Sequence, residues 1–235
     1  MKNIILNRRI NFTIITSIIF LIFTTLGTWQ IYRLKWKLNI IQQIKIQLSM
    51  NALDNKDLVL NDSKLLKYRK IKIYGKFLHK NEIYLYAGNM TPNGKPGYFI
   101  LTPFEYAVNQ FILVNRGFLT TTQKVPNKSR PDNTNNQIQT IEGILIPETY
   151  KPYFVPNNET KNNLWFWINL SEISNYLNMP LYDTIILQYN HHDNTLITNA
   201  FSLQSIRNDH LFYAITWYSI ALAVFILYLR YKNNF

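Results

Sequence analysis

The sequence predicts a membrane-anchored α+β protein, in which two transmembrane helices flank a mostly antiparallel, barrel-like β domain. Three observations lead to this prediction. Residues 10–32 and 211–229 contain no charged side chain, and about 20 apolar residues are enough to cross a bilayer as a helix. Between these runs, from Tyr68 onward, apolar and polar residues alternate with the two-residue period of half-buried strands.

The first uncharged run lies between Arg9 and Arg33. A cleaved signal peptide is the alternative, because basic residues precede the run. We favour an uncleaved transmembrane helix over residues 10–32, since the apolar region of a signal peptide has about 7 to 15 residues and ends in small side chains. This run is longer and ends in bulky residues. A weaker helical pattern continues to Leu48, which predicts an interfacial helix and linker over residues 33–67.

The second span, expected over residues 206–230, sets the orientation of the chain. With two spans, the tails at residues 1–9 and 231–235 lie on one side and the β-rich domain at 68–205 on the other. Both tails contain Lys or Arg, and a loop of this length is translocated largely regardless of its charge. We therefore expect cytoplasmic tails and an extracytoplasmic domain.

The central domain is expected to contain seven short strands. In the first strand Ile71, Ile73 and Phe77 face one way and the lysines between them the other. The strands are expected at residues 69–77, 83–87, 98–104, 111–119, 139–146, 164–170 and 184–189. Turn-forming residues separate them at 93–97, 108–110 and 120–137. One short helix, capped by Ser171, is expected to end near Leu177.

The composition excludes several classes of function. The chain has no cysteine, so it forms no disulfide and has no thiolate nucleophile or thiolate metal site. Its net charge of +12 fits scattered surface lysines, or alternatively a basic face that meets anionic lipid or an acidic partner. No nucleic acid is expected as a partner, because the charge comes without a helix-turn-helix, a zinc knuckle or an aromatic strand signature.

Aromatic and basic residues mark the end of the first span. Trp29, Arg33, Trp36 and Lys37 recur there at helical spacing. Such residues commonly anchor a helix at the level of the lipid headgroups, which is the simplest interpretation of this group.

The second span opens with a group of polar and aromatic side chains. His210, Tyr213, Ala214 and Trp217 stand at i, i+3, i+4 and i+7, so on a helix they share one face. The end of the first span meets the same leaflet, so its residues are expected beside this face; these are Trp29, Gln30 and Arg33. Helix capping by His210, or a hydrogen bond from it to the soluble domain, is the alternative to a binding role.

Five sequence blocks together resemble one known family. They are Gly27-x-Trp-Gln-x-x-Arg-x-x-Trp-Lys, Gly94-Lys-Pro-Gly-Tyr-x-x-x-Thr-Pro103, Val114-Asn-Arg-Gly117, Trp165-Phe-Trp167 and Asn-Asp-His210-x-x-Tyr-Ala-x-Thr-Trp217. Their order and spacing resemble the Surfeit locus protein 1 (Shy one) family of cytochrome c oxidase assembly factors. The chain departs from that pattern at Met90, Phe118 and Asn169, where the family favours a basic residue, tryptophan and aspartate.

The resemblance implies a non-enzymatic factor, located as a multi-pass protein in the bacterial inner membrane with its domain in the periplasm. It implies transient binding of haem a, with the oxidase core subunit as partner and haem a synthase as a second candidate. His210 matches the family's proposed contact to haem iron. Tyr213 and Trp217 are expected to line the porphyrin beside Trp29, and Arg33, Lys35 or Arg116 to pair with its propionates.

Two other functions stay open at this point. A membrane scaffold for oxidase assembly would use His210 and the tryptophans only for helix packing. A membrane-anchored hydrolase is disfavoured, because the sequence lacks a nucleophile elbow and a metal-binding His-Glu pair.

The remaining histidines and one arginine give weaker signals. His191-His192-Asp193 lacks an evident third metal ligand and is expected in an exposed loop, while His79 is expected to be solvated. Arg116 lies within an apolar strand, where a buried guanidinium needs a partner.

Overall fold

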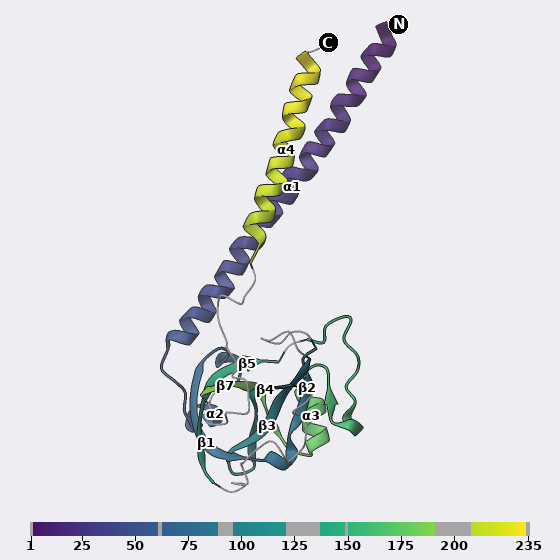
Figure 1. Ribbon diagram of the computed structural model, residues 1–235. Helices are drawn as coiled ribbons and strands as arrows, with labels where there is room; N and C mark the ends of the chain where they lie inside the picture. Colours follow the sequence, from purple (N-terminus) through teal and green to yellow (C-terminus); the bar gives the residue numbers. More distant parts are fainter. Residues whose placement is uncertain are drawn as a thin grey trace. The chain divides into compact units, whose positions relative to one another are not determined.

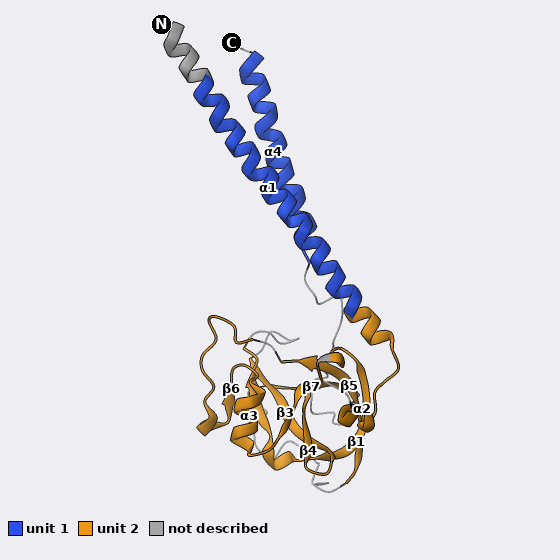
Figure 2. Cartoon of the chain, turned by 180° about the vertical axis from the view of Figure 1, so that it is seen from behind, with its two compact units in different colours: residues 1–43, 203–235 blue, residues 44–202 orange. Residues whose placement is uncertain are grey.

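The chain folds into two compact units. The computed structural model describes residues 2–60, 63–88, 96–120, 137–148, 150–190 and 208–233. One unit contains residues 1–43 and 203–235, and the other contains residues 44–202 (Figure 2). Two of the described helices are long and apolar enough to span a membrane. Both lie wholly or partly in the first unit.

The helical unit pairs the two ends of the chain. Helix α1 runs from Lys2 to Ser49 and helix α4 from His210 to Asn233. They run antiparallel, so both termini lie at the same end of this unit (Figure 1). Ring contacts follow the pair along its length: Phe12 lies 4.0 Å from Tyr231 between centroids, and Phe23 lies 5.7 Å from Trp217. The predicted helical continuation beyond Arg33 is confirmed, because α1 continues unbroken to Ser49.

The contact between α1 and α4 follows a seven-residue repeat. On α4 the buried and half-buried side chains include His210, Ala214, Trp217, Ala221, Val224, Tyr228 and Tyr231. Alternating steps of four and three residues are the spacing of a coiled-coil seam. Small residues let the two backbones approach closely. A Cβ atom on Gly27 would lie only 3.0 Å from the ring of Tyr218, so a larger residue here would require that ring to shift by a few tenths of an ångström.

The second unit is a closed five-stranded barrel with two added strands. Its strands are β1 Lys70–Phe77, β2 Ile83–Tyr86, β3 Gly97–Ala107, β4 Gln110–Thr120, β5 Gln139–Pro147, β6 Leu164–Trp165 and β7 Leu181–Asn190. Their order is β1-β5-β7-β4-β3-β2-β6, and β1 also pairs with β3, which closes the barrel (Figure 1). The pairs β4–β7 and β2–β6 are parallel and the others antiparallel. The predicted mostly antiparallel, barrel-like domain is therefore confirmed.

Short helical segments complete this unit. They are α2 Asn55–Leu60, α3 Leu170–Leu177, and the 3₁₀ turns Ser63–Leu65, His79–Asn81 and Thr160–Asn162. The prediction of a strand from Leu164 to Leu170 was wrong beyond Trp165. The prediction of Ser171 as helix cap was also wrong. Asn169 is the cap: its backbone is extended and its Oδ1 accepts a hydrogen bond from the Glu172 N–H at 3.1 Å, so the helix starts at Leu170.

The two largest hydrophobic clusters of the described residues occupy opposite faces of the sheet. The larger takes side chains from all five barrel strands, including Ile73, Phe104 and Ile186, and fills the barrel. The smaller packs α3, through Leu170 and Ile173, on the other face. In β1 the predicted alternation is confirmed, since its apolar residues are buried and Lys70 and Lys72 are exposed.

One of the three predicted turns lies entirely within the described residues, and parts of the other two lie outside them. The turn at 108–110 joins β3 to β4, and Asn109 adopts a left-handed φ of 55°, which asparagine tolerates better than most residues. Residues 93–95 of the predicted turn at 93–97, and residues 121–136, lie outside the described residues.

Candidate functional site

His210 and Gln30 meet at the start of α4. The ring nitrogen Nδ1 of His210 lies 2.8 Å from Oε1 of Gln30, and the contact is partly buried. Gln30 stands on α1, on the same side of that helix as Gly27, one turn earlier. The paired helices therefore hold the His210 imidazole by a specific polar contact at the end of the pair where α4 begins, which we call its mouth.

An aromatic wall follows two turns further along α4. The Trp217 indole stacks on Phe23 of α1 with an interplanar angle of 19°. Ala214, between His210 and Trp217, is 1% exposed. Of the four residues predicted to share a face, these three lie on the seam with α1.

Tyr213 lies beside this seam rather than in it. Its side chain is 50% exposed. The seam takes positions 210, 214 and 217, and position 213 is rotated by about 60° from position 210 on a helix of 3.6 residues per turn. The structure thus brings His210 and Trp217 to α1 and leaves Tyr213 on the flank.

Arg33 lies between two tryptophans on α1. Its guanidinium carbon is 5.6 Å from the centroid of the Trp29 ring and 5.1 Å from that of Trp36, and both indoles are about half exposed. A guanidinium stacks through its flat face and directs its N–H donors along its edges. Within the described part of the chain no ion pair involves Arg33, so its donors suit an anionic group.

Arg116 lies in the β domain and is 3% exposed. Its Nη1 is 3.2 Å from Nδ1 of His79 and 3.6 Å from Oε1 of Glu82, and its guanidinium carbon lies 4.7 Å from the centroid of the Phe77 ring. The partner that a buried guanidinium needs is therefore Glu82. A contact of Arg116 to a propionate stays a prediction.

The expectation that His79 is solvated was wrong. Its side chain is 13% exposed and Nδ1 lies 3.6 Å from Oε1 of Glu82. The cause is the 3₁₀ turn at His79–Asn81, which follows β1 directly and places His79 and Glu82 three residues apart around the same arginine.

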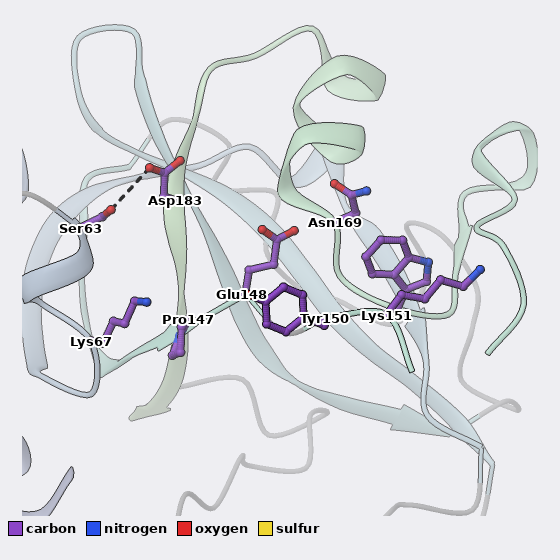
Figure 3. A pocket seen from close by; sticks show the side chains of 9 residues that line it. Ser63, Lys67, Pro147, Glu148, Tyr150, Lys151, Asn169 and Asp183 are labelled. Carbon is purple, nitrogen blue, oxygen red and sulfur yellow. Dashed lines mark hydrogen bonds between the residues drawn. The ribbon is translucent and has the colours of Figure 1, made fainter. Parts of the chain in front are cut away.

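A pocket of about 410 Å³ opens on the β domain (Figure 3). It is lined by Ser63, Lys67, Pro147, Glu148, Tyr150, Lys151, Trp167, Asn169 and Asp183. Glu148 and Tyr150 lie near its centre, with Lys67 and Lys151 on opposite sides. Glu148 accepts a hydrogen bond from the Leu170 N–H at 2.8 Å, and Asp183 accepts one from Ser63 at 3.5 Å.

The carboxylates of this pocket thus already hold the start of α3 and the turn at Ser63. The sequence did not reveal the pocket, because its lining comes from separate segments that the barrel brings together.

No group of three or more metal-binding side chains occurs among the described residues. His191-His192-Asp193 lies outside that part of the chain, as does Met90.

Comparison with known proteins shows the family of the chain. A model of the SURF1 family matches residues 17–222, most of the chain. The chain belongs to the SURF1 family. The resemblance found from its motifs is confirmed.

Its relatives in this family cover nearly all of it. The SURF1-like protein of Rickettsia prowazekii (strain Madrid E) is 35% identical over 96% of this chain and 91% of its own length. Surfeit locus protein 1 of Xenopus tropicalis is 29% identical over 88% of this chain and 71% of its own length. The human Surfeit locus protein 1 is 27% identical over 87% and 72%.

Two residues of the site were not among the predicted binding residues. Gln30 is the direct partner of His210, and Phe23 is the ring under Trp217. The signal for both was the seven-residue repeat: Phe23, Gly27 and Gln30 stand at steps of four and three on α1.

Proposed function

We propose that this chain is a non-enzymatic assembly factor for cytochrome c oxidase. It binds haem a at the mouth of its helix pair and passes it to the oxidase core subunit, with haem a synthase as a second partner. It does so in a bacterial inner membrane, with its tails in the cytoplasm and its β domain in the periplasm. The observation that carries the proposal is the position of His210, held by Gln30 where the second membrane helix begins.

The ligand chemistry at this mouth suits haem as a cargo. His210 would hold the iron of a haem through one nitrogen of its imidazole. The contact with Gln30 engages only Nδ1 of His210, which keeps Nε2 for that purpose. A single histidine holds the iron less firmly than two ligands would, and a carrier must release what it binds.

The neighbouring side chains fit the rest of a porphyrin. Trp217 and Phe23 form a stacked aromatic pair, and an apolar aromatic surface suits the macrocycle. The guanidinium of Arg33 lies 5.6 Å from the centroid of the Trp29 ring and 5.1 Å from that of Trp36, and a guanidinium binds carboxylates such as propionates through paired hydrogen bonds.

A scaffold that never touches haem is the second candidate. One observation favours it: Ala214 and Trp217 lie in the seam between α1 and α4, so both also serve helix packing. On this alternative, His210 and Gln30 only hold the two helices in register.

An absorption spectrum and a pyridine haem assay separate the two. The full chain is purified in detergent from cells that make haem a, beside His210→Ala and the matched control Leu211→Ala, which changes the next, half-exposed residue of the same turn. We expect haem a with the native chain and with Leu211→Ala, and none with His210→Ala at equal folded yield. If no sample holds haem while the oxidase core still co-purifies, the scaffold is the function.

A further inference from the structure

The contact between Gln30 and His210 couples the orientation of the Gln30 amide to the tautomer of the His210 ring. An amide oxygen can accept a hydrogen bond but cannot donate one. The atom that faces Nδ1 of His210 at 2.8 Å is Oε1 of Gln30, a distance typical of a good N–H···O bond. With Oε1 of Gln30 as the acceptor, neutral His210 carries its proton on Nδ1, and Nε2 keeps its lone pair.

We propose that Gln30 is a positioning residue that fixes His210 in the Nδ1–H tautomer and so presents Nε2 to a metal. The identity of that metal as haem iron depends on the function proposed above, whereas the tautomer does not. A histidine side chain in water favours the opposite tautomer, with the proton on Nε2. Without Gln30 the more populated form would thus present the wrong nitrogen.

The place of His210 in the fold explains why it needs such a partner. It is the first residue of α4, so no preceding turn of that helix packs against its ring and limits its rotation. Gln30 lies well inside the long helix α1, on the seam between the helices. Gln30, which lies in the middle of a helix, therefore orients the ring of His210, which its own helix does not hold in place.

The chemical type of the partner also sets the strength of the ligand. A hydrogen-bond acceptor behind a metal-binding histidine raises the basicity of its other nitrogen. A carboxylate does this more strongly than a neutral amide, because its negative charge draws the Nδ1 proton. With an amide in this place, His210 is a ligand of intermediate strength, which suits a protein that gives its cargo away.

The tautomer can be measured without haem. The full chain, labelled with ¹⁵N-histidine, is placed in lipid nanodiscs at mildly alkaline pH, and the spectrum of His210→Gln assigns the His210 signal among the four histidines. We expect a protonated Nδ1 and an unprotonated Nε2, and the reverse in Gln30→Leu. A native His210 with its proton on Nε2, or no change in Gln30→Leu, overturns the proposal.

The strength of the ligand is measured by the rate at which haem a leaves the loaded protein for apomyoglobin. Partners behind a metal ligand typically change affinity by about 10- to 100-fold. We expect Gln30→Leu to lose haem faster by a factor in this range and Gln30→Glu to lose it more slowly. Thr28→Val is the control, since it removes another contact across the same helices, the one between Thr28 and Tyr218 at 3.0 Å.

The two experiments keep the two proposals apart. The expected tautomer in a native chain that takes up no haem supports the role of Gln30 and overturns the proposed function. A rate of haem loss that is unaffected by Gln30→Leu, or is equally raised by Thr28→Val, overturns the role of Gln30 and leaves the function standing.

Discussion

Arg116 and Glu82 form an ion pair inside the β domain, with Nη1 3.6 Å from Oε1. The two side chains are 4% and 10% exposed, so both charges have lost most of their water. Arg116 comes from β4, and Glu82 directly precedes β2. The pair therefore joins the added strand β2 to the barrel. Removing either partner would leave the other charge buried without an opposite charge, at a cost in free energy.

Arg116→Met is expected to lower the free energy of unfolding by about 3 to 5 kcal/mol, because it leaves the Glu82 carboxylate buried without its cation. Denaturant unfolding of the full chain in detergent measures this. Lys72→Met is the control, since it breaks the exposed pair of Lys72 with Glu142, and a much smaller loss is expected. Equal losses in both variants would contradict a structural role of the buried pair.

Gly75→Ala is expected to weaken the pairing of β1 with β3 that closes the barrel. At this residue β1 leaves β5 and begins to pair with β3, and a Cβ atom would lie 2.1 Å from the backbone oxygen of Glu105. Forcing an extra carbon into a packed site costs about 1 to 3 kcal/mol. Hydrogen exchange at Lys76 and Phe77 should become faster. Lys70→Ala, at the exposed start of the same strand, should leave that exchange unchanged.

Stability is expected to fall at alkaline pH through buried tyrosines. Burial raises the pKa of Tyr106 above its ordinary value of 10.0, and it does the same to the pKa of Tyr84. Below pH 10.0 each phenol keeps its proton in the folded and in the unfolded chain, so the stabilising contribution of the buried, neutral tyrosine is fully present. As the pH rises further, the unfolded chain loses the proton first, so stability declines. Unfolding of Tyr106→Phe from pH 9 to about 12 should show a smaller decline than the native chain; an identical decline would contradict the role of Tyr106.

The orientation of the chain can be tested with single cysteines, because the native sequence has none. Val108→Cys lies at the 86% exposed tip between β3 and β4, and Asn233→Cys at the end of α4. With a periplasmic β domain, a membrane-impermeant maleimide should label only the first in intact spheroplasts and both after lysis. Labelling of Asn233→Cys alone before lysis would reverse the orientation.

The architecture could be predicted because its signals are local. Uncharged runs define helices by length alone, and alternation in a strand such as 69–77 follows from the geometry of the pleat. Closure of the barrel was only suggested, since it depends on the pairing of Lys76 in β1 with Glu105 in β3, far apart in sequence. The strand expected at 164–170 ends at Trp165, since the backbone N–H groups of Phe166 and Trp167 donate to Oδ1 of Asn158. At the other end Asn169 caps a helix that begins at Leu170.

The site was predicted in part for a similar reason. His210 and Trp217 stood out by their residue types and spacing, and the expectation that Gln30 lies near them followed from two spans meeting one leaflet. The shared face of a single helix, however, cannot show which side meets a neighbour. Tyr213 fits that face as well as Ala214 does, and only the seven-residue seam with α1 separates them.

The antiparallel pairing of α1 and α4 also sets when the site can form during synthesis. Gln30 is made early, and His210 follows 180 residues later, after the whole barrel. A chain that stops before α4 therefore has the Gln30 amide but lacks the His210 imidazole. A chain in which α4 does not pair with α1 has both side chains without their contact. The hydrogen bond between them is thus a mark of completed translation and insertion.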